Sequence, residues 1–552
     1  MQKIWYSSWD PGIPKVFKPQ KSILQYLQDN VAATPDKIAL SYYGRDMTYR
    51  ELDQNIDRFA AGLIDLGIKK GERVALYLQN CPQFVISYFG SLKVGAIVVS
   101  LNPMFKHNEL EYEINDAGAE TLVTLDYLYP EVIKAGNRIK LKNVISTSFK
   151  DFLPEKPILP LHPEMERPRI KISGAIDFAE FLQSSPARPV YERIDLKEDI
   201  ALLQYTGGTT GLPKGAIITH YTLAHNAMGV KLWFSYTRND VFVGVMPFFH
   251  VAGMVHSMCA ALVSGGQLVV LSRFSPEALA RAVETYKCTV LNTITTMYTA
   301  IIDWLPTGQY DLNSLRLVWE GGSPLLETVE LKLKQMLPGA FVGEGYGLTE
   351  TLTGGVNTPI PHRKPGFIGI PFISTEVAIV DLESGSKKLN PGEEGEIVIR
   401  GPCVMQGYWN KPEETRQQIR GGWLHTGDIG KMDAEGYVAV VGRKKELIKC
   451  SGYSVFPTEV ENLLYKHPAI AEVSVIGIPD PYRGETPKAF VVLNPEYKGK
   501  ICEGEILEWA KDNLAPYKRP SVIEFRDELP KSGAGKILRR VLAEEENRKR
   551  NA

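Results

Sequence analysis

Residues 205–215 read YTGGTTGLPKG, and this stretch joins two apolar runs, IALLQY (200–205) and GAIIT (215–219). Its four glycines let backbone amides approach an anion closely, because glycine adopts positive φ angles at little steric cost. Threonine hydroxyls and the ammonium group of Lys214 add donors, and successive amides in such a turn form a concavity that binds anions. The pattern predicts a phosphate-binding loop in a hairpin. A flexible Gly/Thr turn is the alternative.

Two better-known phosphate loops have a different spacing. A Walker loop ends in Gly-Lys-Ser/Thr, whereas here Pro213 precedes Lys214 and Gly215 follows it. The dinucleotide fingerprint Gly-x-Gly-x-x-Gly joins a strand to a helix, whereas both flanks of this loop resemble strands. The loop therefore belongs to neither class.

Composition narrows the class of protein. The 552 residues include 63 Lys and Arg against 64 Asp and Glu, so the net charge is −1, and 44% of the residues are hydrophobic. These values are typical of a globular protein and exclude disordered or collagen-like chains. The neutral charge gives no reason to expect a nucleic-acid partner. The length exceeds the roughly 250–300 residues that one core usually serves, so we expect at least two packed units.

One apolar stretch raises the question of a membrane span. Residues 241–272 contain no charged side chain over 32 positions, which is long enough to cross a bilayer. Pro247, two histidines and a Gly-Gly pair interrupt it. We therefore predict a buried strand (241–248), a helix (253–263) and a second strand (267–271) in place of a transmembrane helix.

Cysteine usage and the N-terminus bear on the compartment. The six cysteines have irregular spacing and form no Cys-x-x-Cys pair, which favours reduced thiols over a disulfide or zinc framework. Residues 1–14 lack the basic-then-apolar layout of a signal peptide. We expect a cytoplasmic protein.

The order of predicted elements indicates an α/β fold. Helical segments at 23–33 and 49–67 alternate with short apolar strands at 73–78, 96–101 and 121–125, which is typical of layered, mostly parallel sheets. Beyond residue 442 the pattern changes to a compact unit of about 110 residues. There, Thr458 to Glu461 resembles a capping box that opens a helix.

Five motifs in order carry a family resemblance. The loop YTGGTTGLPKG is followed by GYGLTET (345–351), GWLHTGD (422–428), GRKKE (442–446) and PKSGAGK (530–536). This series resembles the adenylate-forming enzymes, which include acyl-CoA synthetases, coumarate–CoA ligases, beetle luciferases and non-ribosomal adenylation domains. The resemblance implies a large N-terminal adenylation domain of several subdomains (1–441) and a small, mobile α+β C-terminal domain (442–552).

The resemblance also implies a nucleotide site. Tyr346 would stack on adenine, Asp428 would accept both ribose hydroxyls with Arg443 beside it, and Thr349 would contact the α-phosphate. Glu350 would offer Mg²⁺ a carboxylate oxygen, with Thr206 as the second metal-site residue. The full set of implied ATP- and AMP-binding residues is Thr206, Gly207, Gly208, Thr209, Thr210, Lys214, Gly321, Gly322, Ser323, Tyr346, Gly347, Asp428 and Arg443.

Further residues are implied for the two half-reactions. Lys536 resembles the lysine that neutralises charge between the carboxylate and the α-phosphate during adenylation. Lys445 occupies the hinge position between two lobe arrangements, and Lys449 belongs to the loop that serves thioester formation. Ser451, Gly452 and Tyr453 would line the CoA tunnel, although many relatives carry two glycines in place of Ser451-Gly452.

The implied reaction joins a carboxylic acid to CoA through an acyl-adenylate, with ATP, CoA and Mg²⁺ taking part. The charge-free stretch would form the acid pocket, with His250 beside the carboxylate, and the lack of an acidic residue in 241–272 disfavours an amino acid. Glu320 stands where relatives carry a small residue. We predict a medium- or long-chain fatty acid as substrate.

Several alternatives stay open. An aryl- or alicyclic-acid–CoA ligase is the nearest, a luciferase-like oxidase is more remote, and a non-catalytic nucleotide-binding protein is disfavoured by the four polar residues Lys214, Glu350, Asp428 and Lys536. The sequence leaves open whether the protein is a monomer or a homodimer, and whether it makes peripheral contact with a membrane.

Overall fold

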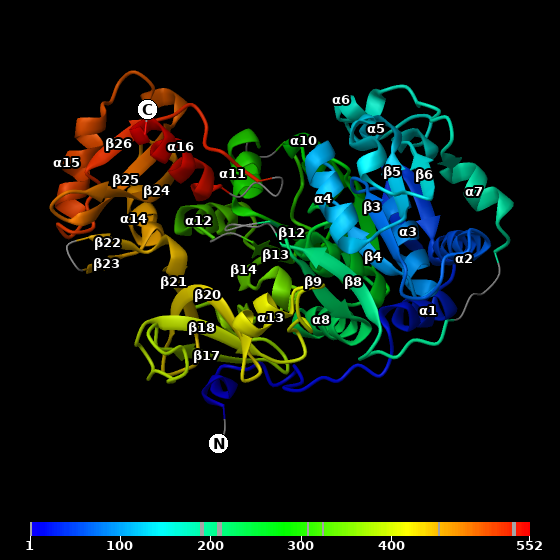
Figure 1. Cartoon of the computed structure of the whole chain (residues 1–552), viewed down its shortest axis with the longest axis horizontal. Coiled ribbons are helices and arrows are strands. Elements are labelled where there is room, and N and C mark those ends of the chain that lie inside the picture. Colours follow the sequence, from blue (N-terminus) through cyan, green and yellow to red (C-terminus); the bar gives the residue numbers. More distant parts are fainter. Residues whose placement is uncertain are drawn as a thin grey trace.

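The computed structural model describes residues 3–187, 192–206, 212–305, 309–322, 325–450, 453–532 and 537–551. Strands in these ranges form four sheets, three in a large lobe and one in a small lobe (Figure 1). The small lobe, orange to red in Figure 1, lies beside α11 (Thr295–Trp304) and α12 (Glu327–Met336). The predicted α/β fold, with a layered large lobe and a small α+β lobe, is confirmed.

Sheet A is the largest of the three sheets of the large lobe and has nine strands in the order β16-β15-β14-β13-β12-β10-β11-β1-β2. Its centre is parallel and its edges are antiparallel. The strands are β1 (Ile38–Tyr42), β2 (Arg45–Thr48), β10 (Val241–Gly244), β11 (Gln267–Val270), β12 (Val290–Thr293), β13 (Leu317–Gly321), β14 (Phe341–Tyr346), β15 (Val356–Asn357) and β16 (Ile370–Pro371).

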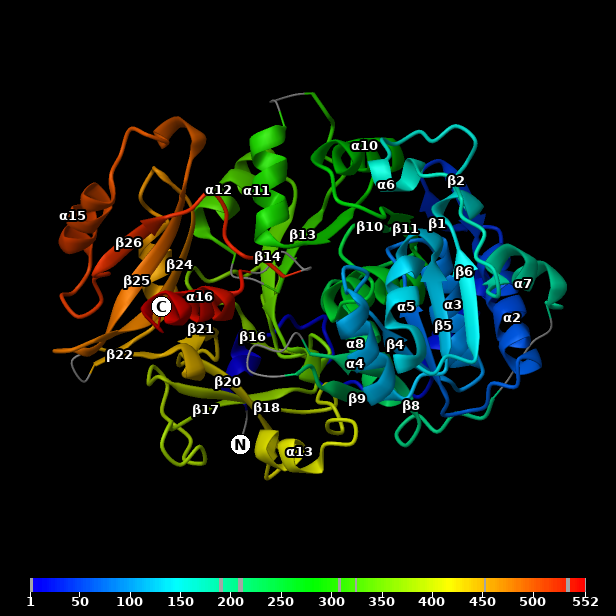
Figure 2. The ribbon, with the colours of Figure 1, turned by 45° about the horizontal axis from the view of Figure 1, so that its top comes forward.

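Sheet B has seven strands in the order β7-β6-β5-β3-β4-β8-β9, and it is parallel except for the hairpin β8–β9. Figure 2 shows its strands side by side, next to α2 (Tyr49–Asp65) and α7 (Phe178–Ser184). The strands are β3 (Arg73–Tyr77), β4 (Ile97–Ser100), β5 (Thr121–Leu125), β6 (Asn143–Thr147), β7 (Ile176–Asp177), β8 (Ile200–Tyr205) and β9 (Gly215–Thr219).

Helices cover the two parallel sheets because strands buried on both faces need apolar partners on each side. Thr48 and Glu51 form a capping box that begins α2: each residue's side chain accepts a hydrogen bond from the other's backbone N–H. Besides α11 and α12, the α-helices of the large lobe are α1 (Ile23–Ala33), α2 (Tyr49–Asp65), α3 (Pro82–Lys93), α4 (His107–Ala117), α5 (Tyr129–Ala135), α6 (Pro163–Glu166), α7 (Phe178–Ser184), α8 (His220–Trp233), α9 (Ala260–Ser264), α10 (Pro276–Tyr286) and α13 (Pro412–Gln418).

The charge-free stretch is folded into the core. It contains β10, a π-helical turn at Gly253–Cys259, α9 and β11, and every residue of the π-helical turn is buried. The predicted strand, helix and strand are therefore present, with a π-helical turn opening the helix. Among the described residues, none of the helices is both long enough and apolar enough to cross a membrane.

Sheet C is antiparallel and completes the large lobe. Its strands are β17 (Glu376–Val380), β18 (Gly395–Arg400), β19 (Ile419–Arg420), β20 (Trp423–Met432) and β21 (Val438–Arg443). The N-terminal segment runs along it in Figure 1: Trp5 occupies the space beside Gly436, and Phe17 N donates 2.9 Å to Ser374 Oγ. The N-terminal residues thus tie sheet C to the rest of the lobe.

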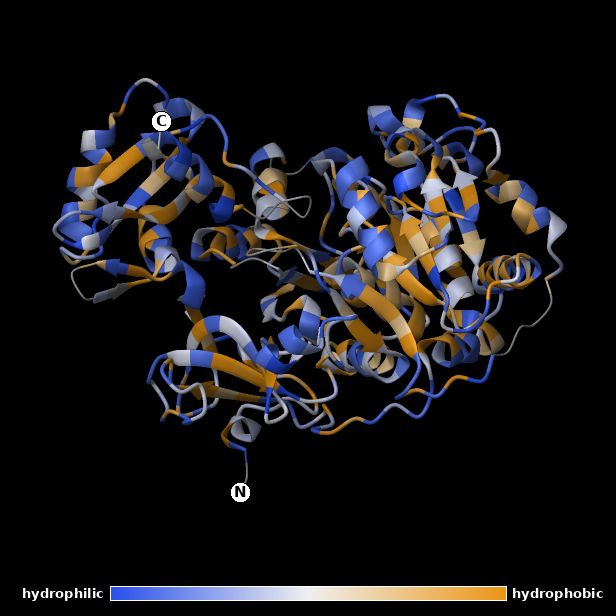
Figure 3. Cartoon of the chain, viewed as in Figure 1, coloured by the Kyte–Doolittle hydropathy of each residue, from blue (hydrophilic) through white to orange (hydrophobic). Residues whose placement is uncertain are grey.

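The small lobe packs helices on an antiparallel sheet to which one parallel strand, β26, is added. Its main hydrophobic cluster begins at Ile448, whereas that of the large lobe ends at Val438, so each lobe has its own core (Figure 3). The elements of sheet D and its helices are β22 (Ile448–Cys450), β23 (Tyr453–Val455), β24 (Ile470–Asp480), β25 (Gly484–Leu493), β26 (Val522–Phe525), α14 (Pro457–Leu464), α15 (Glu503–Asn513) and α16 (Arg539–Asn551).

Two details differ from the sequence-based expectation. The division at 441/442 falls inside β21, which pairs with β20 as far as Arg443, so the chain leaves sheet C only after that residue. The predicted capping box at Thr458 is wrong, because α14 begins one residue earlier, at Pro457, after Phe456. Proline suits the first helical position, since its missing N–H needs no partner there.

Candidate active site

The phosphate loop closes a hairpin, as its flanking sequence predicts. β8 and β9 pair antiparallel up to Tyr205 opposite Gly215. Thr206 N donates 3.0 Å to the Lys214 carbonyl, and Lys214 N donates 3.2 Å to Thr206 Oγ1. These bonds hold Thr206 and Lys214 together at the base of the loop.

A second segment, residues 405–409, brings Glu350 to the base of this loop. Ile217 N donates 2.8 Å to the Gly407 carbonyl, and Met405 N donates 2.8 Å to the Glu350 carbonyl. Tyr408 connects the two sides: its hydroxyl donates 2.7 Å to Glu350 Oε1, and Lys214 Nζ lies 4.4 Å from its ring centroid. Burial and the nearby Glu350 carboxylate raise the pKa of the Tyr408 phenol.

Tyr346, Asp428 and Arg443 form a second cluster. The Tyr346 hydroxyl donates 2.7 Å to Asp428 Oδ2, and Arg443 Nε lies 2.9 Å from Asp428 Oδ1. Asp428 and Arg443 face each other on the paired strands β20 and β21, while Tyr346 ends β14 of sheet A. Because the Asp428 side chain is only 5% exposed, its charge is balanced by Arg443 and not by bulk water.

Glycines shape the ends of β13 and β14. Gly321 pairs with Gly345, and Gly322 has a φ of +120°, which favours glycine. A Cβ at Gly347 would stand 2.4 Å from the Thr353 carbonyl oxygen, so only glycine fits there. The predicted residues Tyr346, Gly347, Thr349 and Glu350 thus follow one another along a tightly packed turn into the 3₁₀ helix Thr349–Thr351.

His250 lies in the loop between β10 and the π-helical turn. Its Nδ1 accepts from Ala252 N at 3.3 Å. The Asn80 amide holds this loop by donating to the Gly244 and Met246 carbonyls and accepting from Phe248 N at 2.7 Å. His250 is half-buried, so the loop presents it at the edge of an apolar wall.

Strand β13 of sheet A carries a bulky and an acidic side chain just before Gly321. Trp319 packs across the neighbouring strand, where a Cβ on Gly343 would stand 2.7 Å from its ring. Glu320 is buried with 1% exposure, and it raises the pKa of the buried Tyr298 phenol after the larger effect of burial itself. Trp319 fills space at one face of the sheet, and Glu320, the next residue of β13, adds a buried acidic group on the opposite face.

The remaining predicted residues of the small lobe lie on sheet D or just before it. Lys445 is in the 3₁₀ turn Lys444–Glu446 between β21 and β22. Lys449 is in β22, where its backbone N donates 2.7 Å to Glu485 Oε2. Tyr453 opens β23 and stacks on Tyr517 with ring centroids 4.5 Å apart. Lys449 and Tyr453 belong to sheet D and Lys445 to the turn before it, whereas the Tyr346 and Tyr408 clusters belong to the large lobe.

Part of the predicted site lies outside the described residues. This applies to Gly207, Gly208, Thr209, Thr210, Ser323, Ser451, Gly452 and Lys536.

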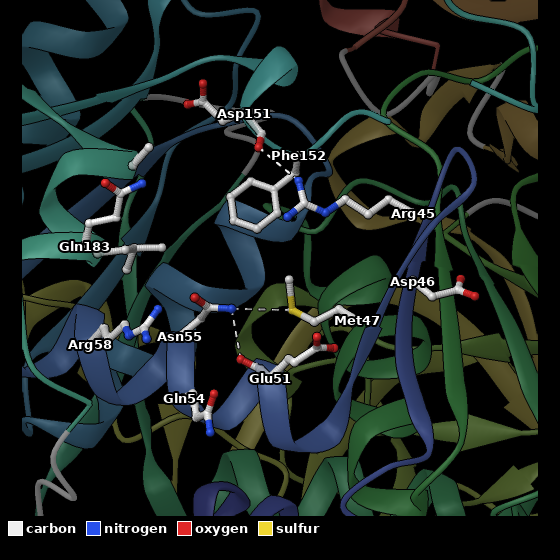
Figure 4. Close-up of a pocket in the computed structure, with 12 residues that line it drawn as sticks. Arg45, Asp46, Met47, Glu51, Gln54, Asn55, Arg58, Asp151, Phe152 and Gln183 are labelled. Carbon is white, nitrogen blue, oxygen red and sulfur yellow. Dashed lines mark hydrogen bonds between the residues drawn. The ribbon is translucent and has the colours of Figure 1, made fainter. Parts of the chain in front are cut away.

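A separate cavity of about 410 Å³ opens between β2, α2 and α7 (Figure 4). Arg45 lies over the Phe152 ring at 5.2 Å and donates 3.3 Å to the Asp151 carbonyl. The wall mixes both signs of charge, which does not suit a polyanionic ligand, and none of the motif residues lines it. Its charged residues are Arg45, Asp46, Glu51, Arg58 and Asp151.

Sequence reasoning missed two groups that organise the site. Tyr408 joins Lys214 to Glu350, and its only signal was an aromatic pair, Tyr408-Trp409, in a polar segment. Arg539 contacts Glu446 of the interlobe turn, the 3₁₀ turn Lys444–Glu446, across 93 positions, a separation that no local pattern reveals.

Comparisons with known proteins identify the family of the chain. A family model described as AMP-binding enzyme matches residues 27–409, and one described as AMP-binding enzyme C-terminal domain matches residues 459–536. The chain belongs to the AMP-binding enzyme family. The predicted resemblance is thereby confirmed, and the lobe order of this AMP-binding enzyme follows that of the two family models.

Relatives cover almost the whole AMP-binding enzyme. A long-chain-fatty-acid–CoA ligase of Bacillus subtilis (strain 168) is 40% identical over 99% of this chain and 98% of the relative. A long-chain-fatty-acid–CoA ligase of Escherichia coli O157:H7 is 34% identical, with the same coverage. Among solved structures, ATP-bound MatB from Rhodopseudomonas palustris has a TM-score of 0.84 at 28% identity and covers 95% of this chain and 98% of its own. The anthranilate CoA ligase AuaEII with anthranoyl-AMP has a TM-score of 0.85 at 28% identity and covers 99% of both.

Proposed function

We propose that this AMP-binding enzyme is an AMP-forming acyl-CoA synthetase that activates a medium- or long-chain fatty acid. The observation that carries the proposal is the Tyr346–Asp428–Arg443 cluster. In it, the Asp428 carboxylate is held by the Tyr346 hydroxyl from sheet A and by the Arg443 guanidinium from sheet C. A ribose with two adjacent hydroxyls and a purine base suits this set of groups.

The first half-reaction places the acid against ATP. The substrate carboxylate attacks the α-phosphorus, and pyrophosphate leaves with the electron pair of the broken P–O bond. Lys214 and the Thr206 hydroxyl bind phosphate oxygens, Thr349 contacts the α-phosphate, and Lys536 neutralises the charge that develops between the two reactants. His250 orients the carboxylate. No covalent enzyme intermediate is needed, so catalysis consists of positioning and charge stabilisation.

Glu350 suits a magnesium ion. Its Oε1 accepts the Tyr408 hydroxyl, and no hydrogen bond or ion pair engages Oε2 within the described ranges, so one carboxylate oxygen stays available beside the phosphate loop. Mg²⁺ prefers such oxygens together with substrate phosphates, and Thr206 supplies a hydroxyl nearby in the loop. When bound, the ion neutralises phosphate charge. Independently of the ion, Tyr408 orients Glu350 and Lys214 orients the phosphates.

In the second half-reaction the CoA thiol attacks the carbonyl carbon of the acyl-adenylate, and AMP leaves. We assign Lys449, Ser451, Gly452 and Tyr453 to the CoA side, with Lys445 as the residue about which the small lobe turns. The position of Lys445 between the last strand of sheet C and the first of sheet D supports this assignment.

Substrate choice is supported by the wall of the site. The π-helical turn Gly253–Cys259 is buried and uncharged, as an aliphatic chain requires. An aryl acid is the second candidate, because the anthranilate CoA ligase AuaEII has the same fold over 99% of both chains. We also propose a cytoplasmic location, because all six cysteines are free thiols.

The decisive experiment measures CoA-dependent AMP release by the full-length enzyme across matched fatty, aromatic, alicyclic and amino acids. We expect the highest kcat/KM with an aliphatic acid. Turnover with amino acids alone, or AMP release without a thioester product, would overturn the proposal. A preference for benzoates or cinnamates would transfer it to the aryl class.

A further inference from the structure

Trp319 lies on the face of sheet A that the π-helical turn covers. Asn292 of β12 pairs with Trp319 in the parallel register, and its side-chain amide donates 2.7 Å to the His256 carbonyl of the turn. Phe234 lies beside both aromatic side chains: its ring centroid is 4.5 Å from that of Trp319 and 6.5 Å from that of His256. Trp319 therefore borders the same interior as the wall that we assign to the acid.

The indole ring of Trp319 directs its N–H toward the carboxyl ends of β13 and β14, two strands that lie side by side in Figure 1. A Cβ on Gly343 would stand 2.7 Å from Cζ3 of the ring, whereas one on Gly345, two residues further along β14, would stand 3.3 Å from Nε1. Nε1 is also 4.0 Å from a Cβ placed on Gly321, the last residue of β13. Because α/β sheets bind ligands at the carboxyl ends of their strands, this N–H faces the proposed site.

The indole N–H and the Asn357 amide are buried without a hydrogen-bond partner. Trp319 and Asn357 are each 1% exposed, and neither Nε1 of the first nor Oδ1 and Nδ2 of the second is hydrogen-bonded in the part of the chain that the structure describes. Asn357 pairs with Gly345 across β14 and β15, and a Cβ on Gly345 would stand only 2.5 Å from Asn357 Oδ1. The amide therefore borders the same space beside Gly345 as the indole N–H.

Unpaired polar groups of this kind are costly in a protein interior. Most buried polar groups are hydrogen-bonded, and a buried group without a partner loses its hydration with nothing to replace it. The indole N–H is a donor only, whereas the amide offers both a donor and an acceptor. A hydroxyl group matches this pair, because it can accept from the indole and donate to the amide oxygen at once. The two atoms lie no further apart than one oxygen with two ordinary hydrogen bonds spans.

Two other buried tryptophans of the large lobe have the ordinary arrangement. Trp233 Nε1 donates 3.0 Å to the Thr358 carbonyl, and Trp9 Nε1 donates 2.8 Å to the Ile13 carbonyl. The unpaired N–H of Trp319 is thus not a general feature of the tryptophans in this lobe.

We propose that Trp319 and Asn357 form a polar subsite that binds a hydroxyl group of the substrate, so that the enzyme prefers hydroxylated carboxylic acids to unsubstituted acids of the same length. This inference rests on the proposed function, since it needs an acid that is activated at the neighbouring nucleotide site. A buried water held by the same two groups is the simpler reading. A water that stays in the subsite gives no preference between the two kinds of acid, whereas a bound substrate hydroxyl does.

The experiment measures acid-dependent pyrophosphate release by the full-length enzyme with octanoic acid and with each of its monohydroxy isomers, from the β-carbon to the terminal carbon. Dodecanoic acid and its isomers form a second series. We expect the kcat/KM of at least one isomer to exceed that of the unsubstituted acid by roughly 10- to 100-fold, because the unsubstituted acid leaves both buried groups unpaired. If the unsubstituted acid equals or exceeds every isomer in both series, the proposal is wrong.

Two variants assign the preference to the two groups. Trp319→Phe keeps an aromatic ring but removes the N–H, and Asn357→Leu keeps the shape of the side chain but removes the amide. Each should reduce the preference for the hydroxylated acid by about tenfold, while the kcat/KM of the unsubstituted acid stays within about twofold or rises. Trp9→Phe is the matched control, because it removes a buried indole N–H that bonds the Ile13 carbonyl, and it should keep the full preference.

The outcomes separate the subsite from the proposed function. Asn357→Leu decides the question if Trp319→Phe does not fold. A preference that is unchanged in the folded variants would mean that the hydroxyl binds elsewhere and would overturn the subsite. A wild-type enzyme that releases no pyrophosphate with any acid would instead refute the proposed function.

Discussion

Tyr408 donates a 2.7 Å hydrogen bond to Glu350, and its ring lies 4.4 Å from the ammonium group of Lys214. One side chain therefore organises the two charged residues that flank the phosphate site. The carboxylate is oriented by the hydroxyl, and the lysine rests on the ring face through a cation–π contact.

Removing this hydroxyl should weaken magnesium dependence without removing the lysine contact. We expect Tyr408→Phe to raise the Mg²⁺ concentration needed for half-maximal AMP release by roughly tenfold, the scale of one hydrogen bond to a charged group. Tyr205→Phe is the control, because its hydroxyl bonds Asp116 and not Glu350. A magnesium titration identical to that of the wild type would refute the role given to Tyr408.

The Asp428 cluster predicts a specific response to the sugar. Asp428→Asn should raise the KM for ATP by roughly 10- to 100-fold, because it removes a charged acceptor and leaves Arg443 unbalanced. The wild type should discriminate against 2′-deoxy-ATP or 3′-deoxy-ATP, and the variant should lose that discrimination. Asp433→Asn, which alters an ion pair with Lys364 just beyond the end of β20, should change neither value. Full retention of discrimination in Asp428→Asn would rule out the ribose contact.

The role proposed for Lys536 predicts that its removal affects one half-reaction more than the other. Lys536→Ala should slow adenylate formation by about 10²–10³-fold, the scale for one electrostatic donor, and should spare thioester formation from supplied acyl-adenylate. Lys531→Ala serves as the control and should affect neither step. Lys531 lies five positions before Lys536 and pairs with Glu472. An equal effect of Lys536→Ala on both steps would contradict the assignment.

Buried histidines predict acid sensitivity. Burial lowers the pKa of His220, His225 and His256 from 6.5 to about 4. Between pH 6.5 and 4 the unfolded chain binds protons that the folded chain excludes, so stability falls as the pH falls through that window. Each histidine should cost about 1 kcal/mol at pH 5.5 relative to pH 7.5.

The check is urea unfolding at several pH values. His225 packs near the Phe17 and Phe372 rings, so His225→Phe should reduce the slope of unfolding free energy against pH. The exposed His362 provides the control variant, His362→Phe, which should keep the full slope. An unchanged slope in His225→Phe would show that this histidine is not held neutral by burial.

Local patterns predicted the elements well where one segment carried the whole signal. The hairpin around the phosphate loop follows from two apolar runs and a glycine-rich turn, and α1 matches its expected range of residues 23–33. The wrong capping box at Thr458 shows the limit of such reasoning. A proline at the first helical position can begin a helix without a side-chain cap, so Thr458 is left to contact Arg539.

Contacts between residues far apart in the chain could not be predicted from the sequence. Nothing near Tyr408 indicates that it meets Glu350, 58 positions away, because that meeting depends on residues 405–409 pairing with β9. The Asn80 contacts that hold the His250 loop likewise join sheet B to sheet A. Such contacts follow from the packing of whole layers, which no window of neighbouring residues contains.

Arg443 holds Asp428, and the next residue along the chain, Lys444, anchors the interlobe turn. In the proposed nucleotide site, a ribose bound at Asp428 would contact Arg443, two residues before Lys445, the proposed hinge. Thermodynamic reciprocity then applies: if the ratio of ATP affinity to AMP affinity differs between two lobe arrangements, the exchange of ATP for AMP changes the ratio of their populations by the same factor. The bound nucleotide, ATP or AMP, would thus determine which lobe arrangement is favoured at each stage of the reaction, with no separate signal required.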